Sequence, residues 1–342
     1  MVSWKDTCKP KIYGGLGIPS VDAMHFAFCC NTVWRFFNSK SYLFGWWKGK
    51  YGSFWNSSIS KRSIYWKALC DVANSILSSI KFNTTPYSTL SFLCDPWCYG
   101  QSIAERLKDF NLEIPSGHSS LTISSFITND IWNLPSYIPF NLADVIHSVP
   151  ICYGLDDCCW AKSEKPSFKN FLKDYYVGPD VVSWYKYVWH RSFAMRFLLY
   201  SWFVFKKGLK KADALLARSI SVNPLCIFCK AERETQNHLF FECDFSFNIL
   251  KSFMPRMNFM LLHPNLWQVF NDIEDREFDI NRKNLCFLLI SAIVYFIWRA
   301  RNDRIFGNIT ESHTAIALKI KSAVYLKSYK KKCFNSPHIL FS

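Results

Sequence analysis

The feature that most constrains this chain is a group of three cysteines and one histidine between residues 226 and 243. Two residues separate Cys226 from Cys229, eight more precede His238, and a further four precede Cys243. Zinc takes four nitrogen or sulfur ligands in a tetrahedron, and two cysteines at this spacing can reach one ion from a single tight turn. We expect the polar residues after Cys229 to form a return loop, and His238 and Cys243 to complete the site from the start of the next helix.

Such a site has a structural role. The protein supplies all four ligands, so no coordination position is left open for a substrate. The sequence therefore predicts one structural Zn²⁺ ion as the cofactor. Two other interpretations stay open at this point: a set of buried thiols beside a core histidine, and a redox pair, which the lack of a surrounding βαβ pattern disfavours.

A second group of cysteines lies in the middle of the chain. Its members are Cys94, Cys98, Cys152, Cys158 and Cys159, with His147 among them. Their separations match no zinc pattern, so we interpret them as core thiols.

The composition requires a buried core. Half of the residues are apolar and 18% are aromatic, which a disordered chain would not contain. Apolar residues recur at helical spacing over residues 24–37, 64–80, 181–219, 247–259, 283–306 and 314–332. Residues 83–91 favour a surface connection, and residues 92–180 alternate short apolar runs with Pro and Gly. The string Gly14-Gly-Leu-Gly-Ile18 lacks the spacing of a dinucleotide fingerprint and predicts a turn with positive φ.

The resulting fold class is mainly α. We expect irregular helical N-terminal and middle regions, a small CCHC zinc module and C-terminal helices. The corresponding segments are residues 1–82, 83–180, 181–255 for the zinc-binding domain and 256–342 for a basic helical tail.

The formal net charge of +15 favours a polyanionic partner, and nucleic acid is the one we predict. Basic residues cluster before and after the zinc ligands, interleaved with aromatic residues, a pattern that suits phosphate contact and base stacking. A solvated helix face is the alternative for both clusters. The candidate contacts are Lys206, Lys207, Lys210, Lys211, Arg218, Arg299, Arg301 and Arg304, with Lys319, Lys321, Lys327, Lys330, Lys331 and Lys332 in the tail.

The same sequence argues against a membrane or secreted protein. The apolar stretch Leu285 to Trp298 is too short and interrupted to span a bilayer, and the start of the chain has no signal-peptide pattern. Fourteen cysteines without such a signal indicate reduced thiols or metal. We expect an intracellular protein, nuclear or cytoplasmic, without a small-molecule substrate.

No complete catalytic machinery is evident. The string Tyr153-Gly-Leu-Asp-Asp157 is similar to the Tyr-x-Asp-Asp turn of reverse transcriptases, but it has one residue too many. Two-metal chemistry also needs several carboxylates that converge on the ions. Walker, HExxH and GxSxG motifs do not occur. The chain is therefore predicted not to be an enzyme by itself.

The span from Trp184 to Phe247 resembles the zinc-binding domain that follows the polymerase in plant non-LTR (LINE-type) retrotransposon reverse transcriptases. The most specific part is the string Glu234-Thr-Gln-Asn-His-Leu-Phe-Phe-Glu-Cys243, after the paired cysteines and a tryptophan-rich helix. The likeness extends over nearly the whole chain. It is carried by Trp4, Cys8, Gly14-Gly-Leu-Gly-Ile18, Trp34-Arg35, Trp46-Trp47-Lys48-Gly49-Lys50-Tyr51, Phe92-Leu-Cys-Asp-Pro-Trp97, Trp132, Trp160 and Trp298-Arg299-Ala-Arg-Asn302.

The resemblance implies a C-terminal fragment that binds template RNA or target DNA without polymerising. The polymerase fingers and palm, and any endonuclease, would lie upstream in such a polyprotein, and this chain looks like the remainder starting at an internal Met. Lys210-Lys-Ala-Asp213 also departs from the more usual Thr-x-Asp. Two alternatives stay open: RNA-directed DNA polymerase activity as part of the full polyprotein, and an inert pseudogene remnant.

Overall fold

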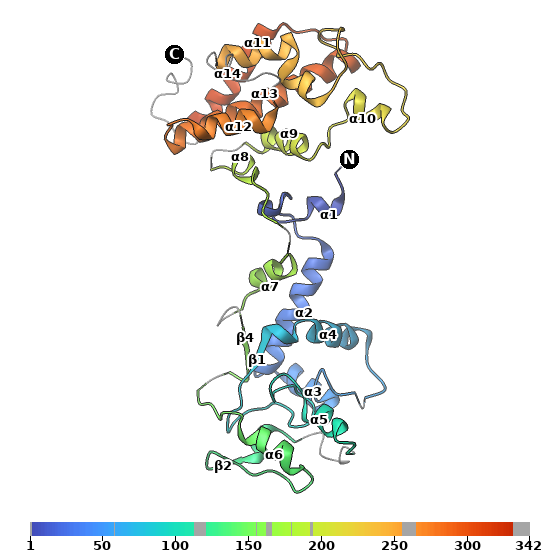
Figure 1. The fold of residues 1–342 in the computed structure, drawn as a ribbon, viewed down its shortest axis with the longest axis vertical. Helices are drawn as coiled ribbons and strands as arrows, with labels where there is room; N and C mark the ends of the chain where they lie inside the picture. The colour runs from blue at the N-terminus through green and yellow to red at the C-terminus, as the bar shows by residue number, and fades with distance from the viewer. Residues whose placement is uncertain are drawn as a thin grey trace. The chain divides into compact units, whose positions relative to one another are not determined.

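The computed structural model describes residues 2–57, 59–112, 121–154, 156–161, 166–178, 180–191, 194–254 and 265–330. The fold is mainly helical with few short strands, which confirms the predicted fold class (Figure 1). Packing groups the chain into two compact units, residues 19–178 and residues 1–18 together with 179–342. This grouping differs from the four segments expected from sequence, because the first eighteen residues pack with the C-terminal half.

The unit of residues 19–178 combines helices with two small antiparallel sheets. Its helices are α2 (Val21–Asn38), α3 (Tyr42–Tyr51), α4 (Ile64–Ser75), α5 (Ile103–Asp109), α6 (Phe140–His147) and α7 (Phe168–Tyr175), with 3-10 turns η2 (Leu77–Ser79) and η4 (Ile123–Phe126). Strand β1 (Ile80–Phe82) pairs with β4 (Cys158–Trp160), and β2 (Ile127–Thr128) pairs with β3 (Ile131–Trp132). The interval predicted as one helix over residues 64–80 therefore ends at Ser75 and turns into a strand.

Aromatic rings fill the core of this unit. The ring of Phe54 stacks on Trp66 at 4.7 Å between centroids, and Tyr51 stacks on the same indole at 4.2 Å. Such offset contacts add to the area that the rings bury. The aromatic excess of the sequence is thus used, in this unit, for core packing.

The second cysteine group lies in or beside this core. Cys94, Cys98 and Cys158 are buried, and burial raises the pKa of all three thiols. Between the first two, the buried carboxylate of Asp95 accepts hydrogen bonds from the Ser53 hydroxyl and from the Ser91 backbone N–H at 2.6 Å. Cys94, Cys98 and Cys158 are therefore core thiols, as interpreted from their spacing, whereas Cys152 and Cys159 are only half-buried.

The second unit is a helical assembly around one long helix. Its elements are α1 (Trp4–Thr7), η1 (Lys11–Tyr13), α8 (Tyr185–Val188), α9 (Met195–Phe205), α10 (Ala212–Leu216), the π-helical turn η5 (His238–Glu242), α11 (Asp244–Phe253), α12 (Leu266–Asp275), α13 (Ile280–Phe306) and α14 (His313–Lys330). Helix α13 packs against α8, α9, α11, α12 and α14, which surround it in Figure 1. The parts of the predicted helices at residues 255–259 and 331–332 lie outside the described residues.

Helix α13 is longer than the apolar stretch that the sequence suggested. The Asp279 side chain caps its start, because it accepts hydrogen bonds from the N–H groups of Asn281 and Arg282 at 2.8 and 3.1 Å. With 27 residues and a mean hydropathy of 1.4 in its most apolar window, it could cross a membrane by length and composition alone. However, 67% of that window is buried within the fold, as expected of a core helix.

The N-terminal eighteen residues are anchored to this unit through the predicted glycine turn. Gly14 and Gly17 have φ of 78° and 74°, so the expectation of positive φ is confirmed. The Trp202 indole N–H donates to the Gly14 carbonyl at 2.9 Å, and the Val182 N–H donates to the Ile12 carbonyl at 2.9 Å. A Cβ on Gly15 would lie 1.9 Å from the Lys9 carbonyl oxygen, so only glycine fits there.

Candidate metal centre

The first two ligands sit on a short hairpin. The Glu234 N–H donates to the Pro224 carbonyl and the Cys226 N–H donates to the Glu232 carbonyl, both at 2.8 Å. The turn closes where the Lys230 N–H donates to the Cys226 carbonyl at 2.8 Å, and Lys230 has a φ of 56°. This tight turn brings Cys226 and Cys229 to the same side of the hairpin.

The other two ligands sit on a π-helical turn. The Cys243 N–H donates to the His238 carbonyl at 2.8 Å, a bond that spans five residues and places the two ligands one turn apart. The Thr235 hydroxyl accepts from the His238 N–H at 3.1 Å, which fixes the start of the turn. Cys243 is also the N-cap residue of α11, so the site closes at the start of the next helix, as predicted.

The four ligand atoms converge. All lie within 4.8 Å of one another, with 3.9 Å between the sulfurs of Cys226 and Cys243 and 3.3 Å between the Cys229 sulfur and Nε2 of His238. Zn–S and Zn–N bonds of about 2.3 and 2.0 Å in a tetrahedron imply sulfur–sulfur and sulfur–nitrogen separations of about 3.8 and 3.5 Å. The cluster is therefore compatible with one zinc ion held by three thiolates and one imidazole.

The surroundings favour the deprotonated form of one ligand, Cys226, which is the form that a metal needs. The hydrogen bond with Cys243 lowers the pKa of Cys226, helped by backbone N–H groups of Cys229 and Phe228. The same bond raises the pKa of Cys243, so the two sulfurs share a proton that a metal would displace. Bound there, zinc would tie the hairpin to the π-turn, while the chemistry of the site stays structural because the shell is closed.

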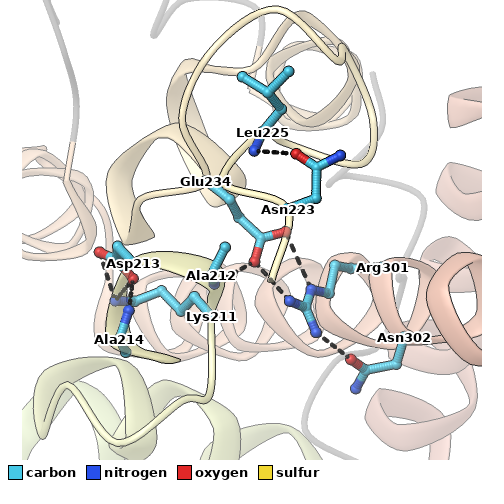
Figure 2. Close-up of polar contacts among 9 residues, drawn as sticks. All are labelled: Lys211, Ala212, Asp213, Ala214, Asn223, Leu225, Glu234, Arg301 and Asn302. Atoms are coloured by element: carbon cyan, nitrogen blue, oxygen red, sulfur yellow. Dashed lines mark hydrogen bonds and ion pairs between the residues drawn. The ribbon is translucent and has the colours of Figure 1, made fainter. Parts of the chain in front are cut away.

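A buried ion pair joins the hairpin to the long helix (Figure 2). The Arg301 guanidinium on α13 donates to both carboxylate oxygens of Glu234, at 2.7 and 3.2 Å. One of these oxygens also accepts from the Ala212 N–H at the start of α10, at 2.9 Å. The side chains of Arg301 and Glu234 are 7% and 1% exposed. This carboxylate therefore connects the zinc hairpin, α10 and α13.

A second arginine of α13 lies beside the ligands. The guanidinium carbon of Arg304 is 4.7 Å from the ring centroid of Phe228 and 4.5 Å from that of Phe245. The two rings stack on each other at 4.3 Å. Phe228 lies between the paired cysteines, and Phe245 follows Cys243 by two positions. Arg304 thus contacts one aromatic residue next to each half of the ligand set.

The residues predicted to contact nucleic acid fall into two sets. Lys207, Lys210 and Arg218 are exposed and form no ion pair with any residue that the structure describes. Arg299 is exposed too, with its Nε 3.5 Å from an Asp303 carboxylate oxygen. The prediction that these residues contact a phosphate backbone stays a prediction.

The remaining candidates are engaged within the fold. Lys211 and Arg301 have side chains that are each 7% exposed and that already pair with Asp213 and Glu234. For these two, the predicted phosphate contact does not agree with the structure, because their charges are used internally. Lys206 lies half-buried 5.9 Å from the Trp184 ring centroid, and Arg304 packs on the ring of Phe228, between two of the metal ligands in the sequence.

Four residues of the predicted Tyr-x-x-Asp-Asp string, Tyr153, Gly154, Asp156 and Asp157, line an open cleft of about 410 Å³ in the unit of residues 19–178. There the Asp157 carboxylate accepts from the N–H and the hydroxyl of Thr89, at 2.9 and 2.7 Å. Lys48 donates to the same hydroxyl at 2.7 Å. Within the described residues, the cysteine–histidine cluster is the one group of three or more ligands placed to share a metal ion.

The spacing of the cysteines and the histidine predicts the four ligands but not the residues that support them. Glu234 belongs to the motif string that ends at Cys243, and its sequence position assigns no role to it, to Phe228 or to Phe245. A glutamate four residues before His238 gave no sign of its partner, because Arg301 lies 67 positions away in the sequence. The one sequence feature that could have indicated a supporting residue is the aromatic Phe228 between the two paired cysteines.

Comparison with known proteins agrees with this geometry. Residues 166–249 match the family model described as zinc-binding in reverse transcriptase. The four converging ligands all lie inside this range, so this part of the chain is a reverse transcriptase zinc-binding domain.

A similar protein is the "Putative ribonuclease H protein" of Arabidopsis thaliana, 20% identical over 344 aligned positions. The alignment covers 91% of this chain and 53% of that protein, so the chain spans about half the length of this relative. No solved structure matches the chain significantly.

Proposed function

We propose that this chain is the post-polymerase, zinc-stabilised part of a plant non-LTR (LINE-type) retrotransposon reverse transcriptase, and that it binds nucleic acid without polymerising by itself. The observation that carries the proposal is the agreement between the matched domain and the converging ligands of the cluster. The net charge of +15 supports a polyanionic partner.

The exposed cations after α9 are the contacts that we favour. Lys207, Lys210 and Arg218 lie on the short segment that leads into the zinc hairpin, and no described residue neutralises them. Phosphate contacts by such residues release counterions, so binding weakens as salt rises, with a logarithmic slope of about −0.9 per contact on duplex DNA. An inert remnant would show no saturable binding at low salt.

The test is a binding titration of the zinc-loaded full chain with fluorescent RNA and DNA over a range of salt concentrations. Reversing Lys207, Lys210 and Arg218 to Glu should weaken binding at least tenfold and flatten the salt dependence. The matched control reverses Lys67, Lys81 and Lys108, three exposed lysines of the other unit, and changes the net charge by the same amount. Equal losses in both variants would mean that net charge alone is responsible.

Catalysis is tested separately. Primer extension with Mg²⁺ should give no synthesis with this chain, and robust synthesis would contradict the proposal. The relative's name describes a putative ribonuclease H protein about twice as long as the alignment, and our proposal includes no such activity for this chain. Cleavage of an RNA–DNA hybrid by the purified chain would require that activity to be added.

We also propose an intracellular location, either nuclear or cytoplasmic. The thirteen described cysteines are all free, which suits a reducing compartment. Detection of an epitope-tagged chain in the culture medium of expressing plant cells, rather than in the cell fractions, would contradict this location.

A further inference from the structure

The metal centre, with its ion bound, would carry a net negative charge that the fold has to balance. Three thiolates around a divalent ion carry one net negative charge, and His238 adds none when it binds as neutral imidazole. The site is largely enclosed, since Cys226, His238 and Cys243 are buried. A net charge held away from water is costly unless an opposite charge lies nearby. The partner should therefore be sought among the side chains around the ligands.

Arg304 is the cation that the fold brings there. Its guanidinium lies within 4.7 Å of the ring centroids of Phe228 and Phe245, the aromatic residues flanking the two cysteine segments. One Nη atom donates to the Glu311 carbonyl at 2.9 Å, which holds the end of the side chain. Its Nε is buried and has no hydrogen-bond partner among the described residues. An unpaired buried donor of a charged group is rare and asks for an explanation.

The electrostatics around Arg304 point to the ligand sulfurs. Burial lowers the pKa of the guanidinium, and the charges of Cys226 and Cys243 act in the opposite direction. Two other arginines of the same helix have different roles: Arg301 is paired with the buried carboxylate of Glu234, and Arg299 is exposed beside Asp303. The described basic side chain placed against both cysteine segments is thus Arg304.

We propose that Arg304 is a positioning residue of the metal centre: its positive charge balances the surplus negative charge of the three-thiolate, one-imidazole zinc site and so sets how tightly the chain retains the ion. The stacked rings of Phe228 and Phe245 hold the guanidinium in place as a cation–π platform. The inference rests on the metal centre and does not depend on nucleic-acid binding.

The test compares zinc affinity, by competition with a chromophoric chelator, in the full chain and three variants. Arg304→Met removes the charge and keeps an apolar side chain, Arg304→Lys keeps the charge, and Arg299→Met removes a charge from the exposed face of the same helix. Loss of a group next to the ligands typically weakens metal binding about 10- to 100-fold. We expect a loss in this range for Arg304→Met, a smaller loss for Arg304→Lys, and a change below about twofold for Arg299→Met.

Two further readouts separate charge from packing. Cobalt-loaded variants should keep the absorption of tetrahedral thiolate coordination, and their helical circular dichroism at saturating zinc should match the parent chain. If Arg304→Met does not fold, Arg304→Gln is compared with Arg304→Lys, and only the lysine should retain affinity.

Three outcomes would overturn the proposal. One is an Arg304→Met affinity within twofold of the parent chain. Another is an equal loss in the lysine and methionine variants, which would indicate packing. The third is an equal loss in Arg299→Met, which would indicate a general charge effect.

Discussion

The two cysteine groups of this chain contain the same side chain in opposite roles. Cys94, Cys98 and Cys158 are buried among aromatic and aliphatic residues, and burial raises the pKa of each thiol. At the metal centre, backbone N–H groups point at Cys226, and a histidine and an arginine lie close by. Burial alone therefore does not distinguish a ligand from a core thiol. The donors and charges around the sulfur distinguish them.

The largest expected effect comes from exchanging cysteines for serines in each group. Cys226→Ser with Cys229→Ser should abolish zinc binding, which in isolated zinc modules is worth about 10 kcal/mol or more of folding free energy. Hydrogen exchange over residues 224–243 should rise to unprotected rates, and elemental analysis should find no zinc.

The matched variant is Cys94→Ser with Cys98→Ser. It should keep one zinc per chain and lose about 1–3 kcal/mol of stability per buried hydroxyl. Zinc retained in the first double variant would contradict the assignment of Cys226 and Cys229 as ligands. Zinc lost in the second would contradict the assignment of Cys94 and Cys98 as core thiols.

A smaller effect is expected at the buried ion pair. Glu234→Gln would leave the Arg301 charge without its partner, and breaking such a pair costs about 3–5 kcal/mol. Denaturant unfolding at saturating zinc measures this loss. The control is Asp303→Asn, which removes the partner of Arg299 on the exposed side of the same helix and should cost about 0–1 kcal/mol. Similar losses of stability in the two variants would mean that the buried Glu234–Arg301 pair contributes no more than the exposed pair.

The smallest effect concerns the carboxylate beside the core thiols. Burial raises the pKa of Asp95 from 3.8 to about 7. Between these values the folded chain holds a proton that the unfolded chain has released, so this group's contribution to stability falls as pH rises and levels off above about 7. Asp95→Asn lacks this dependence.

The stability of the Asp95→Asn variant relative to the parent should therefore increase from pH 5 to pH 8, by a few kcal/mol at most, since each pKa unit is worth about 1.4 kcal/mol. Hydrogen exchange of residues 91–98 at the two pH values measures it. If the stability of the parent and of the variant changed equally with pH, the pH dependence would come from a group other than Asp95.

Local pattern made the ligands predictable, whereas their support depends on distant contacts. The spacing from Cys226 to Cys243 and the polar hairpin between them are features of one short segment. The fold class also followed from helical spacing, although the stretch of residues 181–219 breaks into α8, α9 and α10. The role of Arg301 could not be inferred, because a basic residue near the end of a helix has the same local appearance whether it faces solvent or Glu234.

The discontinuous second unit has a practical consequence for anyone who wishes to study the zinc-binding part alone. Its polypeptide is interrupted after residue 18 and resumes at residue 179, so a fragment that contains only the C-terminal half lacks a piece of it. Such a fragment would leave the Trp202 indole N–H without its Gly14 carbonyl acceptor. Joining residues 1–18 to residue 179 through a short Gly-Ser linker, in place of the intervening unit, would retain that native contact.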